Sequence, residues 1–235
     1  MSDKHLSTQF DAELSGISNR VLEMGGLVES QVTQAMTAFT TFDIEIAEEV
    51  LRQEHHVNRL ELEIDRDLTA IIARRQPTAR DLRLLIAIAK SIANLERVGD
   101  EAARIARAVR RLMSGAPAGR QRLPVSDLRH EADLAIALLR KALDAFARLD
   151  TARALEVLKQ DDEIDREFEG LLRKLITYMM EDPRTISSSI DLVFVAKAIE
   201  RIGDHAKNLA EAIIYVVKGT DVRHTSVEAV EDAVR

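Results

Sequence analysis

The sequence predicts an all-α protein made of two tandem three-helix bundles that arose by internal duplication. Three observations support this fold class. Glycine and proline are scarce, with 9 and 4 residues among 235, where roughly 12% of a chain is usual, and this composition favours long helices over turn-rich sandwiches. The chain repeats itself, and apolar residues recur at steps of three and four in both copies, which is typical of helices that pack along a seam.

The internal repeat is visible in two blocks. Residues 38–59 match residues 145–166, including an identical Ala-Phe and an identical Asp at corresponding places. Further along, LERVGDEAARIARAV at 95–109 matches IERIGDHAKNLAEAI at 199–213. Such self-similarity indicates one helical unit present twice.

The boundary between the copies is expected in residues 114–124, where glycine, proline and small residues gather. We therefore expect a first bundle in residues 1–115 and a second bundle, with a short C-terminal tail, in residues 116–235. The helices are expected at 5–40, 43–75 and 79–113 in the first copy and at 125–148, 151–181 and 184–217 in the second.

Local signals end the second helix of each copy and start the third. Pro77 should push Gln76 out of the helical region. Asp182 followed by Pro183 is a typical helix start, with an acid at the N-cap and proline at the first helical position. Because these connections are short, consecutive helices should be antiparallel neighbours.

Composition also limits the function. The absence of cysteine excludes disulfides, thiolate metal sites and cysteine nucleophiles, and it suits a reducing cytoplasm. A net charge of −7 and only 2 Tyr and 6 Phe argue against nucleic acid as a partner. No apolar run approaches the roughly 20 residues that cross a bilayer, so we expect membrane contact only peripherally, through partners. Neither GxSxG nor a P-loop motif is present, and we expect no enzymatic activity.

A pair of acids lies four residues apart in the third helix of each copy. Glu96 and Asp100 occur within ERVGD, and Glu200 and Asp204 occur within ERIGD. Residues four apart share one face of a helix, and two like charges there cost an isolated helix about 0.2–0.5 kcal/mol. We therefore expect something positive to compensate each pair.

The second helix of each copy carries a matching row of polar residues. The row is Glu54, Asn58 and Glu61 in the first copy, and it contains Asp161 and Asp165 in the second. Each row lies about as far before the proline at the bend as the acid pair lies after it. Because the two helices should be antiparallel, the rows are expected at the same height, facing each other.

Carboxylates gathered in this way can bind a cation that removes their repulsion. All the donors are oxygens, which favours a hard ion such as Mg²⁺, Mn²⁺ or Ca²⁺, or iron held by carboxylates, over zinc. A second interpretation stays open, in which the acids only form salt bridges with the nearby Arg59, Arg97, Arg166 and Arg201. Metal sites and salt-bridged helix flanks are thus alternatives.

These residues and several longer segments together resemble the PhoU family of phosphate-signalling proteins. The segments are LERVGD, IERIGD, RRQPTARDLR, LITYMMEDPRTI and YVVKGTDVRH, and the resemblance covers about residues 5–224. It implies a PhoU-like fold of two three-helix bundles. It also implies metal clusters bound by E(D)xxxD motifs on the second and third helices of each bundle.

Carried over position by position, the motif falls on Glu54, Glu96, Asp100, Asp161, Asp165, Glu200 and Asp204. Asn58 stands where the motif asks for Asp, so the first site has one charge fewer, and Glu61 is the candidate to supply the missing carboxylate. Asn208 and Glu169 are candidate outer ligands in the second copy. The expected cofactor is a divalent or iron cation, with Mg, Mn or Fe as the candidates.

The resemblance further implies a role. It predicts a cytoplasmic negative regulator of the phosphate-starvation response that links the ATPase subunit of a phosphate ABC importer to a sensor histidine kinase, and it predicts a homodimer. Two alternatives are kept. A carboxylate di-iron enzyme would need Glu-x-x-His twice, a spacing that does not occur here. A metal-free structural bundle would contain no bound ion by elemental analysis.

Overall fold

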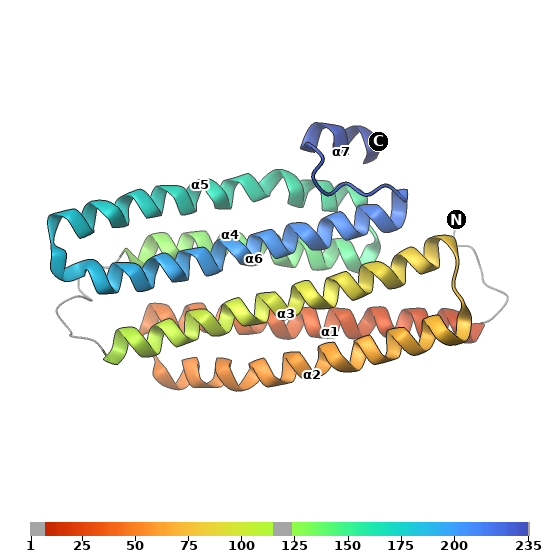
Figure 1. The fold of residues 1–235 in the computed structure, drawn as a ribbon, viewed down its shortest axis with the longest axis horizontal. Helices are drawn as coiled ribbons and strands as arrows, with labels where there is room; N and C mark the ends of the chain where they lie inside the picture. Colours follow the sequence, from red (N-terminus) through yellow and green to blue (C-terminus); the bar gives the residue numbers. More distant parts are fainter. Residues whose placement is uncertain (1–7, 115–123, 235) are drawn as a thin grey trace.

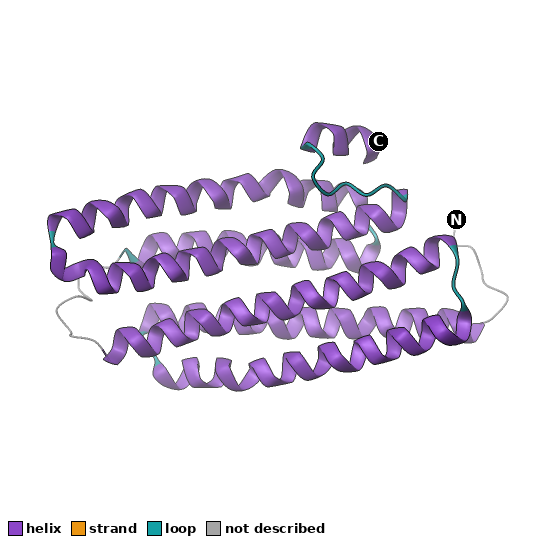
Figure 2. Cartoon of the chain, in the orientation of Figure 1, coloured by secondary structure: helices purple, strands orange, loops and turns teal. Residues whose placement is uncertain are grey.

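The structure is a computed structural model that describes residues 8–114 and 124–234. The described residues are almost entirely helical and contain no strand (Figure 2). The helices are α1 (Thr8–Thr41), α2 (Ile44–Arg75), α3 (Ala79–Ser114), α4 (Val125–Arg148), α5 (Thr151–Glu181), α6 (Ile186–Lys218) and α7 (Val227–Val234), with a short 3-10 turn η2 (Pro183–Thr185) before α6.

The six long helices form two three-helix bundles that lie side by side along their length (Figure 1). One bundle contains α1, α2 and α3, and the other contains α4, α5 and α6. Between the bundles, α3 packs on α6 in the most extensive contact of any two helices, and α1 packs on α4. The all-α fold class with two tandem three-helix bundles is thus confirmed. The expected domain boundary after residue 115 lies outside the described residues.

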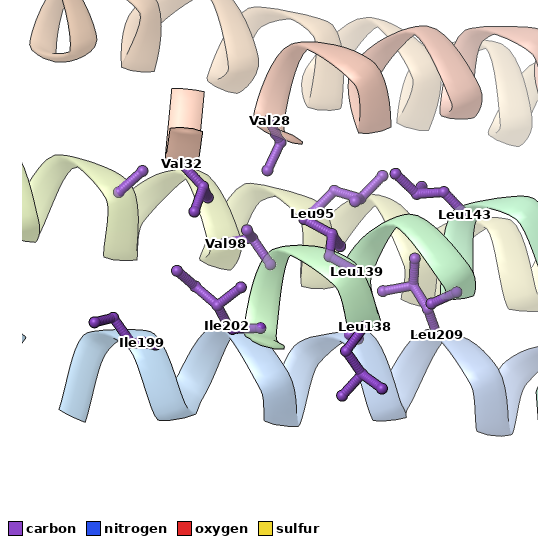
Figure 3. Packing of buried hydrophobic residues seen from close by; sticks show 14 of the residues in the cluster. Val28, Val32, Leu95, Val98, Leu138, Leu139, Leu143, Ile199, Ile202 and Leu209 are labelled. Carbon is purple, nitrogen blue, oxygen red and sulfur yellow. The ribbon is translucent and has the colours of Figure 1, made fainter. Parts of the chain in front are cut away.

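The two bundles share one hydrophobic core. Its main cluster contains buried side chains from both copies, including Val28 of α1, Val98 of α3, Leu139 of α4 and Ile202 of α6, which meet where the bundles touch (Figure 3). Burial of apolar surface is the dominant favourable contribution to folding. The contact between the copies therefore belongs to the core of the protein.

The expected bends at the prolines are confirmed. Gln76, which precedes Pro77, leaves the right-handed region with φ 47° and ψ 56°, and its backbone N–H donates to the carbonyl of Ile72. Asp182 has an extended backbone and accepts a hydrogen bond from the Arg184 N–H at 3.1 Å. A turn of 3-10 helix then leads into α6, so the α-helix begins two residues later than the predicted 184.

Two aspartates at matching places of the repeat start the middle helices. Asp43 accepts from the N–H groups of Glu45 and Ile46 at the start of α2. Asp150 accepts in the same way at the start of α5. These caps satisfy backbone donors that have no partner inside a helix. They therefore fix the residues at which α2 and α5 begin.

Helix α7 is a difference from the expected short tail. It has 8 residues, which is too short for a periodic apolar pattern to predict a helix. A helix of this length is also only marginally stable by itself. Tertiary contacts stabilise it instead. Val230 is buried against the core, and Glu231 pairs with Lys159 of α5 at 2.8 Å. Within the described residues, no helix combines the length and apolarity needed to cross a membrane.

Candidate metal centres

The first-copy acids lie on the facing flanks of α2 and α3. Burial raises the pKa of Glu96, and Asp100, Glu61 and Glu54 raise it further by their charges. Burial also raises the pKa of Glu61, with Asp100 on the other helix adding to the effect. Asn58 is half-buried in the same row of α2. The structure therefore gathers carboxylates from both helices into one electrostatic neighbourhood.

Arginines partly neutralise this first cluster. Arg107 of α3 donates from one nitrogen to both carboxylate oxygens of Glu54, at 3.0 and 2.8 Å. Arg97 lies 3.5 Å from Glu96 and 3.7 Å from Asp100. The salt-bridge interpretation thus holds for Arg97, which the sequence suggested, and for Arg107, which it did not.

The second-copy acids lie between α5 and α6. Burial raises the pKa of Asp204, and Glu200 and Asp161 raise it further. Burial likewise raises the pKa of Asp165, with Asp161 and Asp204 adding to the effect. The side chain of Asp161 is almost fully buried, and its Oδ2 accepts from Lys207 Nζ at 2.6 Å. Four acids from two helices therefore share this neighbourhood with two lysines, Lys207 and Lys197.

Asp162 joins this second cluster. One carboxylate oxygen from each of Asp161, Asp162 and Asp165 can be chosen so that all three lie within 4.8 Å of one another. Among the described residues these are the only three acids or histidines grouped so closely. Asp162 is exposed and sits on the turn of α5 that the predicted pair shares. Inspection of residues beside the motif would have found it.

Glu200 has one oxygen paired and one oxygen buried. Its Oε1 accepts from Lys197 Nζ at 2.5 Å. Its Oε2 has no hydrogen-bond partner in the described part of the chain. A buried carboxylate oxygen without a partner is costly, and a cation would satisfy it. The donor set of both clusters is oxygen only, which fits a hard ion such as Mg²⁺ or Mn²⁺, or carboxylate-bound iron.

Glu131 of α4 is a buried acid that the sequence analysis missed. It is 1% exposed, and neither carboxylate oxygen finds a hydrogen-bond partner among the described residues. Burial raises its pKa to about 8, and the charges of Glu167 and Glu200 add to the shift. In the register of the repeat its counterpart is Met24, a fully buried core residue. An acid at a position where the other copy has an apolar residue is the sequence signal that could have found it.

The two candidate outer ligands have other contacts. Asn208 donates from Nδ2 to Oδ1 of Asn94, at 3.0 Å, across the contact between the copies. Glu169 is exposed and pairs with Arg173, one turn along α5, at 2.9 Å. These contacts give each of the two residues a role in helix stability or helix packing without a metal.

Both copies match the model of one protein family, described as the PhoU domain. The matched residues are 21–109 and 128–213. They include every candidate ligand of the two clusters.

Curated relatives match almost the whole chain. A phosphate-specific transport system accessory protein PhoU homolog from Burkholderia sp is 51% identical over 228 residues, covering 97% of each chain. A protein of the same description from Pseudomonas putida is 48% identical, covering 94% of this chain and 85% of its own. The crystal structure of PhoU from Pseudomonas aeruginosa is 44% identical, has a TM-score of 0.86, and aligns with 90% of this chain and 100% of its own.

Proposed function

Because the chain belongs to the PhoU domain family, we propose that it is an accessory regulator of a phosphate-specific transport system. The observation that carries this proposal is the match of both copies and of nearly the full length to relatives with that description. The proposed sense of regulation is negative: the protein holds the phosphate-starvation response off when phosphate is plentiful.

The proposed mode of action is that of an adaptor without catalytic activity. It acts in the cytoplasm, where it links the ATPase subunit of a phosphate ABC importer to a sensor histidine kinase and reaches the membrane only through them. A surface feature supports partner binding. Ile186, Ile190 and Phe194 form a row at steps of four on α6, and they are 41%, 45% and 62% exposed. Exposed apolar side chains grouped in this way are typical of protein contacts, including the proposed homodimer.

The proposed cofactor is a hard cation at each carboxylate cluster. In the first cluster Glu54, Glu61, Glu96 and Asp100 would supply carboxylate oxygens and Asn58 an amide oxygen. In the second cluster Asp161, Asp165, Glu200 and Asp204 would supply carboxylates. Such an ion would join the second and third helices of a bundle and so fix the surface that they present. Burial and, after it, the charges of neighbouring acids raise the pKa of Glu96, Asp165 and Asp204. This supports the proposal, because a bound cation would offset both the burial of the carboxylates and their repulsion.

A metal-free bundle is the second candidate, and one observation favours it. Arg107, Lys197 and Lys207 already compensate Glu54, Glu200 and Asp161. Elemental analysis of the gently purified protein separates the two candidates, because only the first expects bound metal that is lost when the acids are replaced.

The double variant Glu96→Ala with Asp100→Ala tests the function. It should fold, bind less metal because the first cluster has lost two ligands, and fail to repress a phosphate-starvation reporter in cells that lack the native copy. The matched control is Glu63→Ala with Asp67→Ala, another acidic pair at a step of four on an exposed flank, which pairs with Arg20. Capture of the importer ATPase and the kinase in high and low phosphate completes the test. Full repression by the double variant would contradict the metal part, and repression by a strain lacking the protein would contradict the regulatory role.

A further inference from the structure

Residues of α3 and α6 line a cavity of about 260 Å³. These are the two helices that pack on each other between the bundles (Figure 1). Five cationic side chains line the cavity. They are Arg104, Arg107 and Arg111 of α3 and Lys197 and Arg201 of α6, and Glu101 is the one acid in the lining. Arginines concentrated in a recess are suited to phosphoryl groups, because the planar guanidinium donates two parallel hydrogen bonds.

Two of these cations connect the cavity to the carboxylate clusters. Arg107 pairs with Glu54 of the first cluster at 2.8 Å, and Lys197 pairs with Glu200 of the second cluster at 2.5 Å. An ion held by Glu54 or Glu200 would take the carboxylate away from its basic partner. The cavity would then gain uncompensated positive charge from both bundles.

The remaining cations are only partly compensated. Arg201 and Arg104 share the single carboxylate of Glu101, at 3.2 and 3.4 Å. Arg111 pairs with Asp191 at 2.7 Å, but its side chain is 51% exposed. Exposed ion pairs are weak and exchange readily, so Arg111 can turn to an incoming anion. Glu101 is 1% exposed, and its one negative charge leaves the two arginines beside it with a net positive charge.

The internal repeat provides a comparison within the same molecule. The counterparts of Arg104, Arg107, Arg111 and Lys197 are Asn208, Glu211, Tyr215 and Ala93. These four residues line a second cavity of about 320 Å³ at the equivalent place of the α3 and α6 contact. The packing of the two helices therefore creates two cavities, and only one of them has basic residues at all four of these positions. The basic character does not follow from the fold.

We propose that the cavity between α3 and α6 binds an anion that carries phosphoryl groups, and that cations bound at the two carboxylate clusters strengthen this binding by releasing Arg107 and Lys197. The second half of the proposal rests on the metal sites of the proposed function. Phe194, which is 62% exposed, also lines the cavity and offers a face on which a nucleotide base can stack. Inorganic phosphate, a short polyphosphate and a nucleotide are the possible sources of the phosphoryl group.

Isothermal titration calorimetry, which measures the affinity of each anion for the full chain, tests the proposal. The probes are inorganic phosphate, tripolyphosphate and ATP, with sulfate as a control anion, each added to chelator-treated protein and to Mn²⁺-loaded protein freed of excess metal. At least one phosphoryl probe should bind more tightly than sulfate. The variant Arg104→Gln with Arg111→Gln should weaken that binding by at least about tenfold.

The matched control is Arg52→Gln with Arg140→Gln. It makes the same change of net charge at two side chains that are 66% exposed and paired with Glu49 and Glu29, away from the cavity. It should bind the probe as the unchanged protein does. Equal weakening in both double variants would show that overall charge attracts the anion and would overturn the proposal, as would the absence of binding by every probe.

A further variant separates this proposal from the metal sites. Glu54→Gln with Glu200→Gln releases Arg107 and Lys197 without any ion, so the chelator-treated variant should bind the probe more tightly than the chelator-treated native chain. If that increase occurs while the native chain binds no metal, the anion site stands and the metal part of the proposed function fails. If the native chain binds metal but neither metal nor the variant changes anion affinity, the coupling is overturned.

Discussion

Lys207 of α6 places its Nζ 2.6 Å from Oδ2 of Asp161 on α5. Asp161, the most buried acid of the second cluster, therefore has a charged partner that lies one helical turn after Asp204. Burial lowers the pKa of Lys207, but the bond and charge of Asp161 outweigh that effect and raise it. The ammonium group of Lys207 thus contacts an acid that the sequence predicts to be a metal ligand. A cation at this cluster must compete with a side chain of the protein itself.

This competition leads to the first prediction. Lys207→Gln should destabilise the chelator-treated protein by about 1–3 kcal/mol, because Asp161 is left buried without its charged partner. Added Mn²⁺ should restore stability to a greater extent than it stabilises the native chain. Thermal unfolding with and without Mn²⁺ measures both effects. Lys174→Gln, which removes an exposed pair with Asp127, is the control, and equal behaviour of the two variants would contradict the prediction.

The second prediction concerns the pH dependence of stability. Since burial raises the pKa of Glu131 from 4.5 to about 8, the folded protein holds a proton that the unfolded chain releases. Stability should therefore fall as the pH rises from about 4.5 to 8, by roughly 4–5 kcal/mol at most, and then level off. Glu131→Met, which copies the residue at Met24, should remove this part of the profile.

Urea unfolding of the chelator-treated protein at a series of pH values checks the Glu131 prediction. At pH 8 the Glu131→Met variant should be more stable than the native chain, whereas near pH 4.5 the two should be similar. The exposed Glu163→Met serves as the control and should leave the pH profile unchanged. A Glu131→Met profile that still falls over the same interval would assign the dependence to other groups.

The third prediction concerns the close packing of α5 and α6 beside the second cluster. A Cβ on Gly203 would lie 2.9 Å from Cδ1 of Ile164. Gly203→Ala should destabilise the protein by about 1–2 kcal/mol, because the isoleucine must move within a packed core. A Cβ on Gly170 meets no atom within 4 Å in the part of the chain that the structure describes. Gly170→Ala should therefore stabilise by about 0.5–1 kcal/mol, and chemical unfolding of both variants tests the contrast.

The fourth prediction concerns the amide in the first cluster. Asn58→Asp adds a carboxylate to the row that contains Glu54 and Glu61, so it should lower stability in chelator by about 0.5 kcal/mol and raise the metal content of the first bundle. Asn58→Ala should lower the metal content without the added repulsion. Metal analysis together with thermal unfolding measures the two effects. An Asn58→Asp protein with unchanged metal content would show that Asn58 lies outside any ion site.

The sequence predicted the fold because its signals are local or repeated. Proline positions, the scarcity of glycine and the duplicated apolar seams each act over a few residues or are confirmed by the second copy. The long helices accordingly lie within a few residues of their expected bounds. Helix α7 escaped prediction because contacts of Val230 and Glu231 with distant residues stabilise it.

The candidate site was predictable in part. The grouping of acids on α2 with α3 and on α5 with α6 follows from equal distances to the bends. The partners of those acids do not follow from the sequence, because Arg107 of α3 and Glu54 of α2 are 53 residues apart in the chain and meet only when the helices pack. The basic cavity is likewise invisible in the sequence, because Lys197 and Arg104 are brought together by the packing of one copy on the other.

The shared core between α3 and α6 has a consequence for the melting of the protein. A chain made of two duplicated units would show two calorimetric transitions if each unit unfolded independently. Here the loss of either unit exposes the apolar face of the survivor. Scanning calorimetry should therefore record one cooperative transition, with equal calorimetric and van't Hoff enthalpies.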